Sequence, residues 1–222
     1  MPSSEEISRI RNEYLRAALS EDAAGSDPLA LFEKWLNEAI EAEVAEPTAF
    51  TLASADTAGR PSARIVLLKG FDARGFVFYT NYESRKGREL SENDHVCLNF
   101  AWLELQRQVR IDGRAVRVSR DESREYFLSR PPGSRIGAIA SPQSKSIPNR
   151  EFLENEFERV RSAHEDDAIP LPDYWGGYRV AADAVEFWQG RENRLHDRFL
   201  FTRESGQADA SPDAWKRDRL AP

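Results

Sequence analysis

Apolar residues in the first 45 positions recur three or four residues apart, as they do on one face of a helix. Residues 4–19 carry this pattern among many charges, which predicts an exposed helix. A second helix is expected to begin at Pro28, because Asp27 can cap its first turn and proline is well tolerated there. The apolar stripe of this second helix consists of Leu29, Phe32, Trp35, Leu36, Ala39 and Ile40. Such a stripe should pack on a sheet.

From Ala49 onward the pattern changes to that of strands. The segments "AFTLAS", "SARIVLLKGF" and "FVFYTN" are separated by the turn sequences "DTAGRP" and "DARG", which predicts an antiparallel meander. The segment "HVCLNFAWLELQRQVRIDGRAVRVS" predicts two or more long strands with Asp112-Gly113 as a turn. Near the end of the chain, "AVEFWQG" and "HDRFLFTRE" predict a final hairpin.

Three further helices are expected among the strands. They lie in "ESRKGRELSEN", in "RDESREYFLSRP" up to a stop at Pro131-Pro132, and in "IPNREFLENEFERVRSAH". In the last of these, the side chains expected to face inward are Phe152, Leu153, Phe157 and Val160. We therefore predict a mainly β fold, an antiparallel β-barrel with flanking helices. Residues 1–45 would form N-terminal helices, and residues 46–222 would form the barrel domain.

The composition is that of an ordinary soluble protein. The 222 residues are 40% hydrophobic and 31% charged, with a net charge of -7 and a pI near 5.2. This acidic balance disfavours a nucleic-acid or membrane-surface role for the whole molecule, although it allows a local basic pocket. The start of the chain lacks a basic leader, and no apolar run reaches the roughly 18 residues of a membrane helix. We therefore expect a cytoplasmic protein without a membrane partner.

Several kinds of site are excluded or disfavoured by what the sequence lacks. Cys97 is the only cysteine, which excludes an internal disulfide and a thiolate-rich metal centre. The three histidines do not have metal-ligand spacing, so no metal site is expected. The motifs of dinucleotide folds, phosphate-binding loops, serine hydrolases and zinc proteases are also absent.

The stretch "NRLHDRFLF" concentrates cations in an acidic chain. Arg194, His196 and Arg198 alternate, so in an extended strand all three side chains would leave the same face. One interpretation is a solvated face, with Leu195 and Phe199 turned inward. The other is that an anionic ligand lies nearby, because like charges on one strand face repel each other.

A second group of cations stands at the start of a predicted helix. Ser84 is placed to cap the helix in "YTNYESRKGREL", which puts Arg85 and Lys86 in its first turn. The helix dipole disfavours cations there, whereas a phosphate bound at the helix end would favour them. Solvated surface residues explain the same pattern.

A third group surrounds the double proline. Tyr126 and Arg130 stand four residues apart on one helical face, and Ser134 lies just beyond. These hydroxyl and guanidinium groups could form a phosphate cradle, although a generic helix end explains them equally well. Lys69 closes an apolar run and faces away from Arg64 in a regular strand. It could simply extend its amine to solvent.

Taken together, the motifs resemble those of the pyridoxamine 5'-phosphate oxidases. The matching segments are "RIVLLKGFDARGFVFYTNYESRKGREL", "LQRQV", "YFLSRPPGSRIGAIASPQS", "PDYWGGYRV", "EFWQGRENRLHDRF" and "DRLAP". They follow one another in register from about Glu46 to Pro222, with a fainter match in "IRNEY". The resemblance implies an FMN-binding split β-barrel and a homodimer with FMN at the subunit interface.

The resemblance also implies roles for particular residues. From one subunit FMN would be held by Arg64, Ile65, Val66, Leu67, Leu68, Lys69, Tyr79, Thr80, Arg85, Lys86 and Gln108. From the other subunit it would be reached by Gln143, Ser144, Trp188 and Arg198. The substrate phosphate would meet Lys69, Tyr126, Arg130 and Ser134. The substrate ring would lie beneath Arg194, Leu195 and His196, with Arg194 and His196 as the catalytic pair, and a lid would include Arg11 and Tyr14. Glu46 would be an acidic residue near the site.

The implied activity is oxidation of pyridoxamine and pyridoxine 5'-phosphates to pyridoxal 5'-phosphate. A hydride would pass from the substrate C4' atom to FMN, the imine would hydrolyse to the aldehyde, and dioxygen would reoxidise the flavin to give hydrogen peroxide. Three alternatives remain: a flavin oxidase of the phenazine-biosynthesis type, a non-catalytic carrier of FMN or pyridoxal phosphate, and a nucleic-acid module, which the pI disfavours.

Overall fold

The computed structural model describes residues 3, 5, 17–164, 168–203 and 215–222. The helix expected over residues 4–19 therefore lies mostly outside the described residues, as do Arg11 and Tyr14. The chain divides into two compact units. The first comprises Met1–Thr48, Asn99–Ile111 and Asp183–Pro222, and the second comprises Ala49–Leu98 and Asp112–Ala182.

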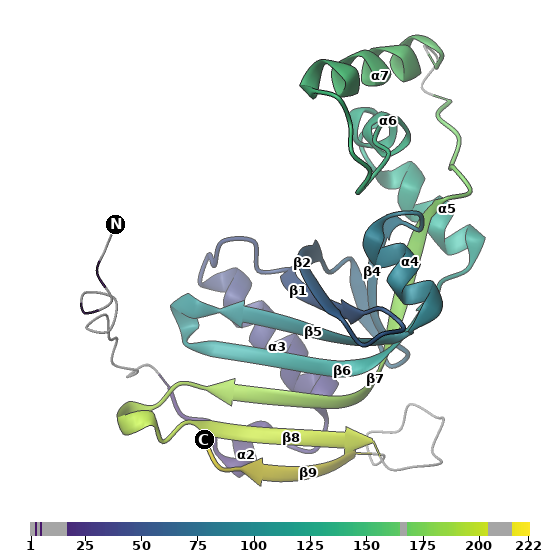
Figure 1. Cartoon of the computed structure of the whole chain (residues 1–222). Coiled ribbons are helices and arrows are strands. Elements are labelled where there is room, and N and C mark those ends of the chain that lie inside the picture. Colours follow the sequence, from purple (N-terminus) through teal and green to yellow (C-terminus); the bar gives the residue numbers. More distant parts are fainter. Residues whose placement is uncertain (1–2, 4, 6–16, 165–167, 204–214) are drawn as a thin grey trace. The chain divides into compact units, whose positions relative to one another are not determined.

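The described part of the chain is dominated by a nine-stranded sheet (Figure 1). Its strands are β1 (Ala49–Ala55), β2 (Pro61–Leu67), β3 (Gly70–Asp72), β4 (Gly75–Asn81), β5 (His95–Trp102), β6 (Arg107–Arg117), β7 (Trp175–Gln189), β8 (Asp197–Arg203) and β9 (Trp215–Leu220). Hydrogen bonding links them in the order β2-β1-β5-β6-β7-β4-β3, and β8 pairs with both β7 and β9. The pairs β1/β2, β3/β4, β4/β7, β7/β8 and β8/β9 are antiparallel. The mainly β prediction is confirmed.

Helices accompany both units. They are α2 (Glu21–Ala24), α3 (Pro28–Glu41), α4 (Arg85–Glu92), α5 (Arg120–Ser129), α6 (Pro132–Ala140) and α7 (Arg150–Ser162), with short 3-10 turns η1 (Leu103–Leu105) and η2 (Glu192–Arg194). No helix in the described residues is long and apolar enough to cross a membrane.

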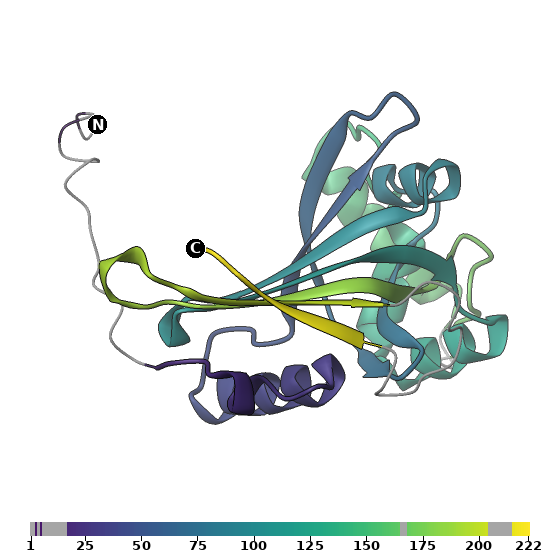
Figure 2. The same ribbon diagram turned by 90° about the horizontal axis from the view of Figure 1, so that it is seen from below.

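In the first unit, α3 lies along the sheet (Figure 2), and its buried side chains supply much of the core. Asp27 caps the helix by accepting a hydrogen bond from the Leu29 N–H, as predicted. The Trp35 ring meets Phe187 of β7 edge-to-face, with 5.2 Å between ring centroids. Ile40, which the periodicity assigned to the apolar stripe, is 51% exposed, so that part of the prediction is wrong. Ile40 stands in the last turn, where the helix ends at Glu41.

The second unit contains two hairpins rather than one meander. β1 pairs with β2, and β3 pairs with β4, but β2 and β4 are not neighbours in the sheet. The expected single strand "SARIVLLKGF" is broken at Leu68 and Lys69, between β2 and β3. Leu68 is buried, and the Lys69 N–H donates to the Val77 carbonyl at 2.8 Å. The break therefore lets one apolar run serve two hairpins.

Asp112-Gly113 is not a turn, contrary to the prediction, because β6 continues through it. A Cβ atom at Gly113 would lie 2.1 Å from the Ala181 carbonyl oxygen, so the glycine allows close approach of two backbones. The chain reverses instead after η1, where Gln106 has φ 56°.

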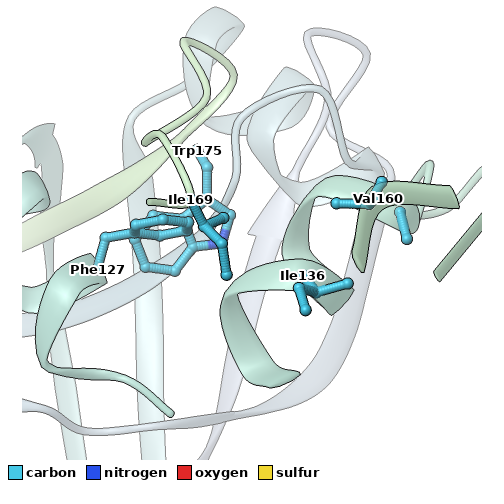
Figure 3. Packing of buried hydrophobic residues seen from close by; sticks show 6 residues of the cluster. Phe127, Ile136, Val160, Ile169 and Trp175 are labelled. Atoms are coloured by element: carbon cyan, nitrogen blue, oxygen red, sulfur yellow. The ribbon is translucent and has the colours of Figure 1, made fainter. Parts of the chain in front are cut away.

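The helices α5, α6 and α7 share a hydrophobic cluster with Trp175 at the start of β7 (Figure 3). The buried members are Phe127, Ile136, Ala140, Val160, Ile169 and Trp175. The double proline ends α5 as predicted, but Pro132 also begins α6, which the sequence patterns did not predict. Phe152, expected to face inward from α7, is 36% exposed, whereas Val160 is buried as expected.

Candidate active site

The second unit contains a cavity of about 420 Å³. Its walls come from β2, β4, α4, α5, α6, the loop after α6 and the start of β7. The lining residues are Ile65, Val66, Leu67, Lys69, Tyr79, Thr80, Asn81, Lys86, Tyr126, Arg130, Gly137, Ala138, Ser141, Gln143 and Trp175. Three of these side chains are cationic and none is a carboxylate. An acidic chain thus presents a positively charged hollow, which suits an anionic ligand.

The break between β2 and β3 brings Lys69 to this cavity. In a regular strand, Lys69 and Arg64 would face opposite sides, but the hydrogen bond from the Lys69 N–H to Val77 belongs to a separate hairpin. The end of β2 lies beside it, with Ile65 66% exposed. An exposed isoleucine on a strand that lines a cavity leaves apolar surface free for a ligand or a partner chain.

The first turn of α4 contributes Lys86. Ser84 caps the helix by accepting a hydrogen bond from the Gly87 N–H at 3.2 Å, as predicted. A Cβ atom at position 87 would lie 2.1 Å from the Tyr82 carbonyl oxygen, so glycine is required for this close fit. The Lys86 ammonium donates to Thr80 Oγ1 at 3.1 Å. Thr80 Oγ1 in turn donates to Gln143 Oε1 at 3.2 Å.

The pKa of the Lys86 ammonium lies close to neutral pH. Burial and, to a smaller extent, the nearby Arg64 guanidinium lower the pKa of Lys86, Glu89 opposes the shift, and together they place the pKa at about 8. At neutral pH the group is therefore charged but poorly compensated, and an added anion would stabilise its protonated form.

One wall of the cavity is aromatic. The rings of Tyr79 and Tyr126 stack with centroids 3.9 Å apart, and Tyr79 also stacks on Trp175 at 5.6 Å. Burial raises the pKa of Tyr79 to about 12 and raises the pKa of Tyr126 as well. Both phenols therefore stay protonated near neutral pH and can donate hydrogen bonds to a ligand.

Arg130 extends over this wall. Its guanidinium carbon lies 4.8 Å from the Trp175 ring centroid, a cation–π geometry. The Nη1 atom is buried and has no hydrogen-bond partner among the described residues. Burial also lowers the pKa of the guanidinium. An unpartnered buried donor is costly, so the arrangement is explained if an anion occupies the cavity.

The cations of "RLHDR" belong to the first unit and do not share one strand face. Arg194 lies in η2 with φ 63°, and β8 begins only at Asp197. The single-face prediction is therefore wrong, because the chain turns before the strand starts. Leu195 is 69% exposed, so the alternative that turned it inward is also wrong, whereas Phe199 is buried.

His196 has a defined setting in the first unit. Its ring centroid lies 4.5 Å from that of Trp188, and its Nδ1 accepts a hydrogen bond from the Arg191 N–H at 3.0 Å. Burial, and then the Arg194 charge, lower the pKa of His196. Because Nδ1 accepts the hydrogen bond from Arg191, the neutral ring carries its proton on Nε2. Leu195 and His196 line a hollow of about 390 Å³ together with the C-terminal residues 219–222.

Arg198 is fixed by its neighbours. Its Nε donates to Glu186 Oε1 at 2.9 Å, and its Nη1 donates to the Ala221 carbonyl at 2.9 Å. Glu186 is buried and also pairs with Arg110 at 3.1 Å. The guanidinium thus ties β8 to β7 and to the end of the chain.

In the second unit, the structure brings together most of the residues that were expected around FMN and the substrate phosphate. Those that line the cavity are Ile65, Val66, Leu67, Lys69, Tyr79, Thr80, Lys86, Tyr126, Arg130 and Gln143. Five expected residues of the same unit do not line the cavity. They are Arg64 and Arg85, which hydrogen-bond to Glu89, Leu68, which is buried, and Ser134 and Ser144, which are exposed. Gln108, Trp188, Arg194, Leu195, His196, Arg198 and Glu46 belong to the first unit.

Sequence reasoning missed some lining residues. Asn81, Gly137, Ala138, Ser141 and Trp175 lie in quoted motifs but were given no role. For Trp175, the signal was an aromatic residue followed by two glycines. A Cβ atom at Gly177 would lie 2.8 Å from Tyr79, so the glycines allow the aromatic wall to form. In the described residues, no group of three His, Cys, Asp or Glu side chains could hold a metal ion.

Two family models match this chain. Residues 36–164 match the model described as "Pyridoxamine 5'-phosphate oxidase". Residues 175–222 match "Pyridoxine 5'-phosphate oxidase C-terminal dimerisation region". The first match contains the cavity residues from β2 to the loop after α6, and the second contains β7, β8 and β9.

Curated relatives match almost end to end. A pyridoxine/pyridoxamine 5'-phosphate oxidase of Leptospira interrogans is 51% identical over 216 residues, covering 97% of this chain and 98% of the relative. The enzyme of the same name from Rubrobacter xylanophilus is 51% identical over 217 residues, covering 98% of this chain and 97% of the relative.

Solved structures share the fold. PhzG from Burkholderia lata, solved with tetrahydrophenazine-1-carboxylic acid, has a TM-score of 0.83 at 33% identity, covering 90% of this chain and 95% of that one. A pyridoxamine 5'-phosphate oxidase-related, FMN binding protein from Nostoc punctiforme has a TM-score of 0.65 at 16% identity, covering 86% and 97%. The predicted split β-barrel fold class is thereby confirmed. With two family models and end-to-end relatives in agreement, this chain belongs to the pyridoxamine 5'-phosphate oxidase family.

Proposed function

We propose that this chain is an FMN-dependent oxidase that converts pyridoxamine and pyridoxine 5'-phosphates to pyridoxal 5'-phosphate. Dioxygen would be the electron acceptor and would be reduced to hydrogen peroxide, and oxidation of pyridoxamine 5'-phosphate would also consume water and release ammonia. The observation that carries the proposal is the unpartnered, buried Nη1 of Arg130 in a cavity that has three cations and no carboxylate. The names of relatives at 51% identity support the same substrates.

The residues present fit FMN and a phosphorylated substrate. The phosphate of FMN would meet Lys86 near the start of α4, where Arg64 and Arg85 add positive charge. The substrate phosphate would meet Lys69, Tyr126 and Arg130. The end of β2, from Ile65 to Leu67, would provide apolar and backbone contacts for a flat ring system.

Bound FMN would supply the redox chemistry, which is removal of a hydride from the substrate C4' atom and transfer of the two electrons to dioxygen. The protein's task is then to bind and orient. Arg130 and Lys69 would anchor one end of the substrate, so that its reactive carbon is held in a fixed position. Arg194 would polarise the phenolic oxygen of the substrate ring, and His196 would support that contact through its Nε2–H.

The site would be completed by a second copy of this chain. The match of β7–β9 to a dimerisation region supports a homodimer, and Ile65 and Leu195 leave apolar surface exposed in the single chain. We propose that Ser144, Trp188 and Arg198 reach FMN from the partner subunit, whereas Gln143, which lines the cavity of its own chain and accepts a hydrogen bond from Thr80 Oγ1, would meet FMN there. The lid role of Arg11 and Tyr14 falls outside the described residues.

One anaerobic titration tests the proposal. Pyridoxamine 5'-phosphate added to the FMN-loaded protein without oxygen should bleach the flavin absorbance, and admission of air should restore it. If the protein binds FMN but the substrate leaves the flavin oxidised, the chain is a carrier rather than an oxidase. A preparation that FMN cannot turn yellow would contradict the cofactor itself.

A phenazine-type oxidase is the second candidate, because the likeness to PhzG has a TM-score of 0.83. The bound molecule in that structure carries a carboxylate, and the free donor of Arg130 would suit either a carboxylate or a phosphate. The same anaerobic titration with tetrahydrophenazine-1-carboxylic acid distinguishes the two. Faster bleaching by the carboxylate than by pyridoxamine 5'-phosphate would favour the second candidate.

A further inference from the structure

A buried carboxylate stands next to the proposed FMN phosphate site, where a negative charge should weaken anion binding. Glu89 lies in α4 one turn after Arg85, and its side chain is only 7% exposed. It does not line the cavity, and neither the sequence motifs nor the comparisons give it a role. Its position requires an explanation.

Both oxygens of Glu89 are fully engaged. Oε2 accepts hydrogen bonds from Ser54 Oγ at 2.6 Å, from Ser62 Oγ at 2.5 Å and from Arg64 Nη2 at 3.1 Å. Oε1 accepts from Arg85 Nε at 2.8 Å. Burial favours the neutral carboxyl, but these donors outweigh it and hold the pKa of Glu89 at about 2. The group is therefore ionised at neutral pH.

The same contacts fix two cations in place. The Arg64 guanidinium also donates through Nη1 to Ser54 Oγ at 2.6 Å and to the Leu52 carbonyl at 3.2 Å. Arg85, whose side chain is 62% exposed, is held by its ion pair with Glu89. Loss of the carboxylate would leave Arg85 free to turn into solvent, since its side chain makes no other hydrogen bond or ion pair with the residues that the structure describes.

The net charge of these four side chains also suits a phosphate. Arg64, Arg85 and Lys86 supply three positive charges and Glu89 one negative charge, which leaves two. A phosphate monoester carries about 1.5 to 2 negative charges near pH 7. Arg64, in β2, lowers the pKa of Lys86, whereas the negative charge of Glu89, in the same helix as Lys86, raises it. Glu89 therefore helps to keep Lys86 protonated.

Resting on the proposed function, we propose that Glu89 is a positioning residue for the FMN phosphate. It holds the Arg64 and Arg85 guanidinium groups beside the start of α4 and matches the charge of the cationic group to that of a phosphate dianion. A carboxylate that would repel the ligand on its own thereby strengthens its binding.

The test compares FMN with riboflavin, which lacks the phosphate. Dissociation constants of both are measured by flavin fluorescence for the wild type, Glu89→Gln and the control Glu92→Gln, which changes an exposed carboxylate in the same helix. Glu89→Gln should weaken FMN binding by about tenfold and leave riboflavin binding within about twofold. Glu92→Gln should change neither.

The pH profile gives a second readout. Without Glu89, Lys86 should lose its proton at lower pH, so the decline of FMN affinity with rising pH should begin earlier in Glu89→Gln than in the wild type. If Glu89→Gln does not fold, Glu89→Asp is measured against the same two ligands and should weaken FMN binding alone, because the shorter side chain keeps the charge but not the reach.

Two outcomes would overturn the inference. FMN affinity that is unchanged or higher in Glu89→Gln would show that the carboxylate is merely a repulsive charge. An equal loss of FMN and riboflavin binding would show a general structural role. Either result leaves the proposed function standing, because that function fails only if the wild type does not bind FMN or its flavin is not reduced.

Discussion

The guanidinium of Arg130 lies over the ring of Trp175, 4.8 Å from the ring centroid, with its Nη1 buried and unpartnered among the described residues. Trp175 itself packs edge-to-face on Phe127, at 5.1 Å, within the cluster shared by three helices (Figure 3). A hydrophobic cluster therefore orients a cation toward a cavity.

Arg130→Ala should raise KM for pyridoxamine 5'-phosphate by about tenfold to a hundredfold with little change in kcat, because it removes a charge-assisted contact worth about 1.5–3 kcal/mol. Lys69→Ala should act in the same direction. Steady-state kinetics at saturating oxygen measure both effects. Arg130→Lys is the matched control and should recover part of the loss. An unaltered KM in Arg130→Ala would remove the phosphate role.

Trp175→Ala should destabilise the protein and weaken substrate binding together. Loss of a buried tryptophan lowers the free energy of unfolding by about 3–5 kcal/mol, and it also removes the surface on which Arg130 rests. Trp175→Phe keeps an aromatic face and should lose less of both. Urea denaturation and KM measurements on the two variants check this. A normal KM in a destabilised Trp175→Ala variant would show that Trp175 stabilises the core but does not support substrate binding.

Arg194→Ala should lower kcat/KM for pyridoxine 5'-phosphate while FMN affinity stays unchanged, because Arg194 is proposed to contact the substrate ring and not the cofactor. A reduction of about tenfold or more is expected for a lost charge-assisted contact. Turnover kinetics and a flavin fluorescence titration on the same preparation provide the two values. Equal turnover by variant and wild type would exclude the role.

His196 should titrate below its usual pKa of 6.5, because burial and the Arg194 charge both favour the neutral ring. The ring is then neutral at pH 7 and takes up its proton only as the pH falls below 6.5. In Arg194→Ala one of the two causes is absent, so the pKa of His196 should rise. NMR titration of the imidazole signals, assigned with His196→Gln, tests both statements. A midpoint above 6.5 in the wild type would contradict them.

FMN affinity should decline as the pH rises through about 8, the pKa of Lys86. The sign follows from the charge: protonated Lys86 attracts the phosphate, whose own second pKa of about 6 keeps it ionised throughout this range. Lys86→Met should bind FMN more weakly at neutral pH and lose this dependence. Fluorescence titrations from about pH 7 to pH 9.5 provide the profile. A wild-type profile that is flat through pH 8 would exclude Lys86 from the phosphate site.

The local signals in the sequence predicted local structure well. Asp27 and Ser84 cap their helices as expected, because a cap depends only on the residues of one turn. The hairpin that joins β7 and β8 was likewise evident from its alternating pattern, and Val185 pairs with Phe201 in it. Resemblance to a family then indicated most of the residues that line the cavity.

The predictions that were wrong concern segments whose structure depends on residues distant in the sequence. The break at Lys69 exists because its N–H pairs with Val77, and Asp112-Gly113 stays extended because the Ala181 backbone comes close. Neither partner is visible in the segment itself. The positive φ of Arg194 is similarly invisible in an alternating pattern, which reads as a strand.

Gly87 has a consequence for how this protein can diverge. The start of α4 rests on the Tyr82 backbone through a glycine, so the end of the helix that we propose to bind phosphate is positioned by main-chain contact. Substitutions elsewhere on the outer face of α4 can accumulate without displacing that end. The helix can therefore acquire new surface properties over evolution while the geometry that a phosphorylated cofactor requires is inherited unchanged.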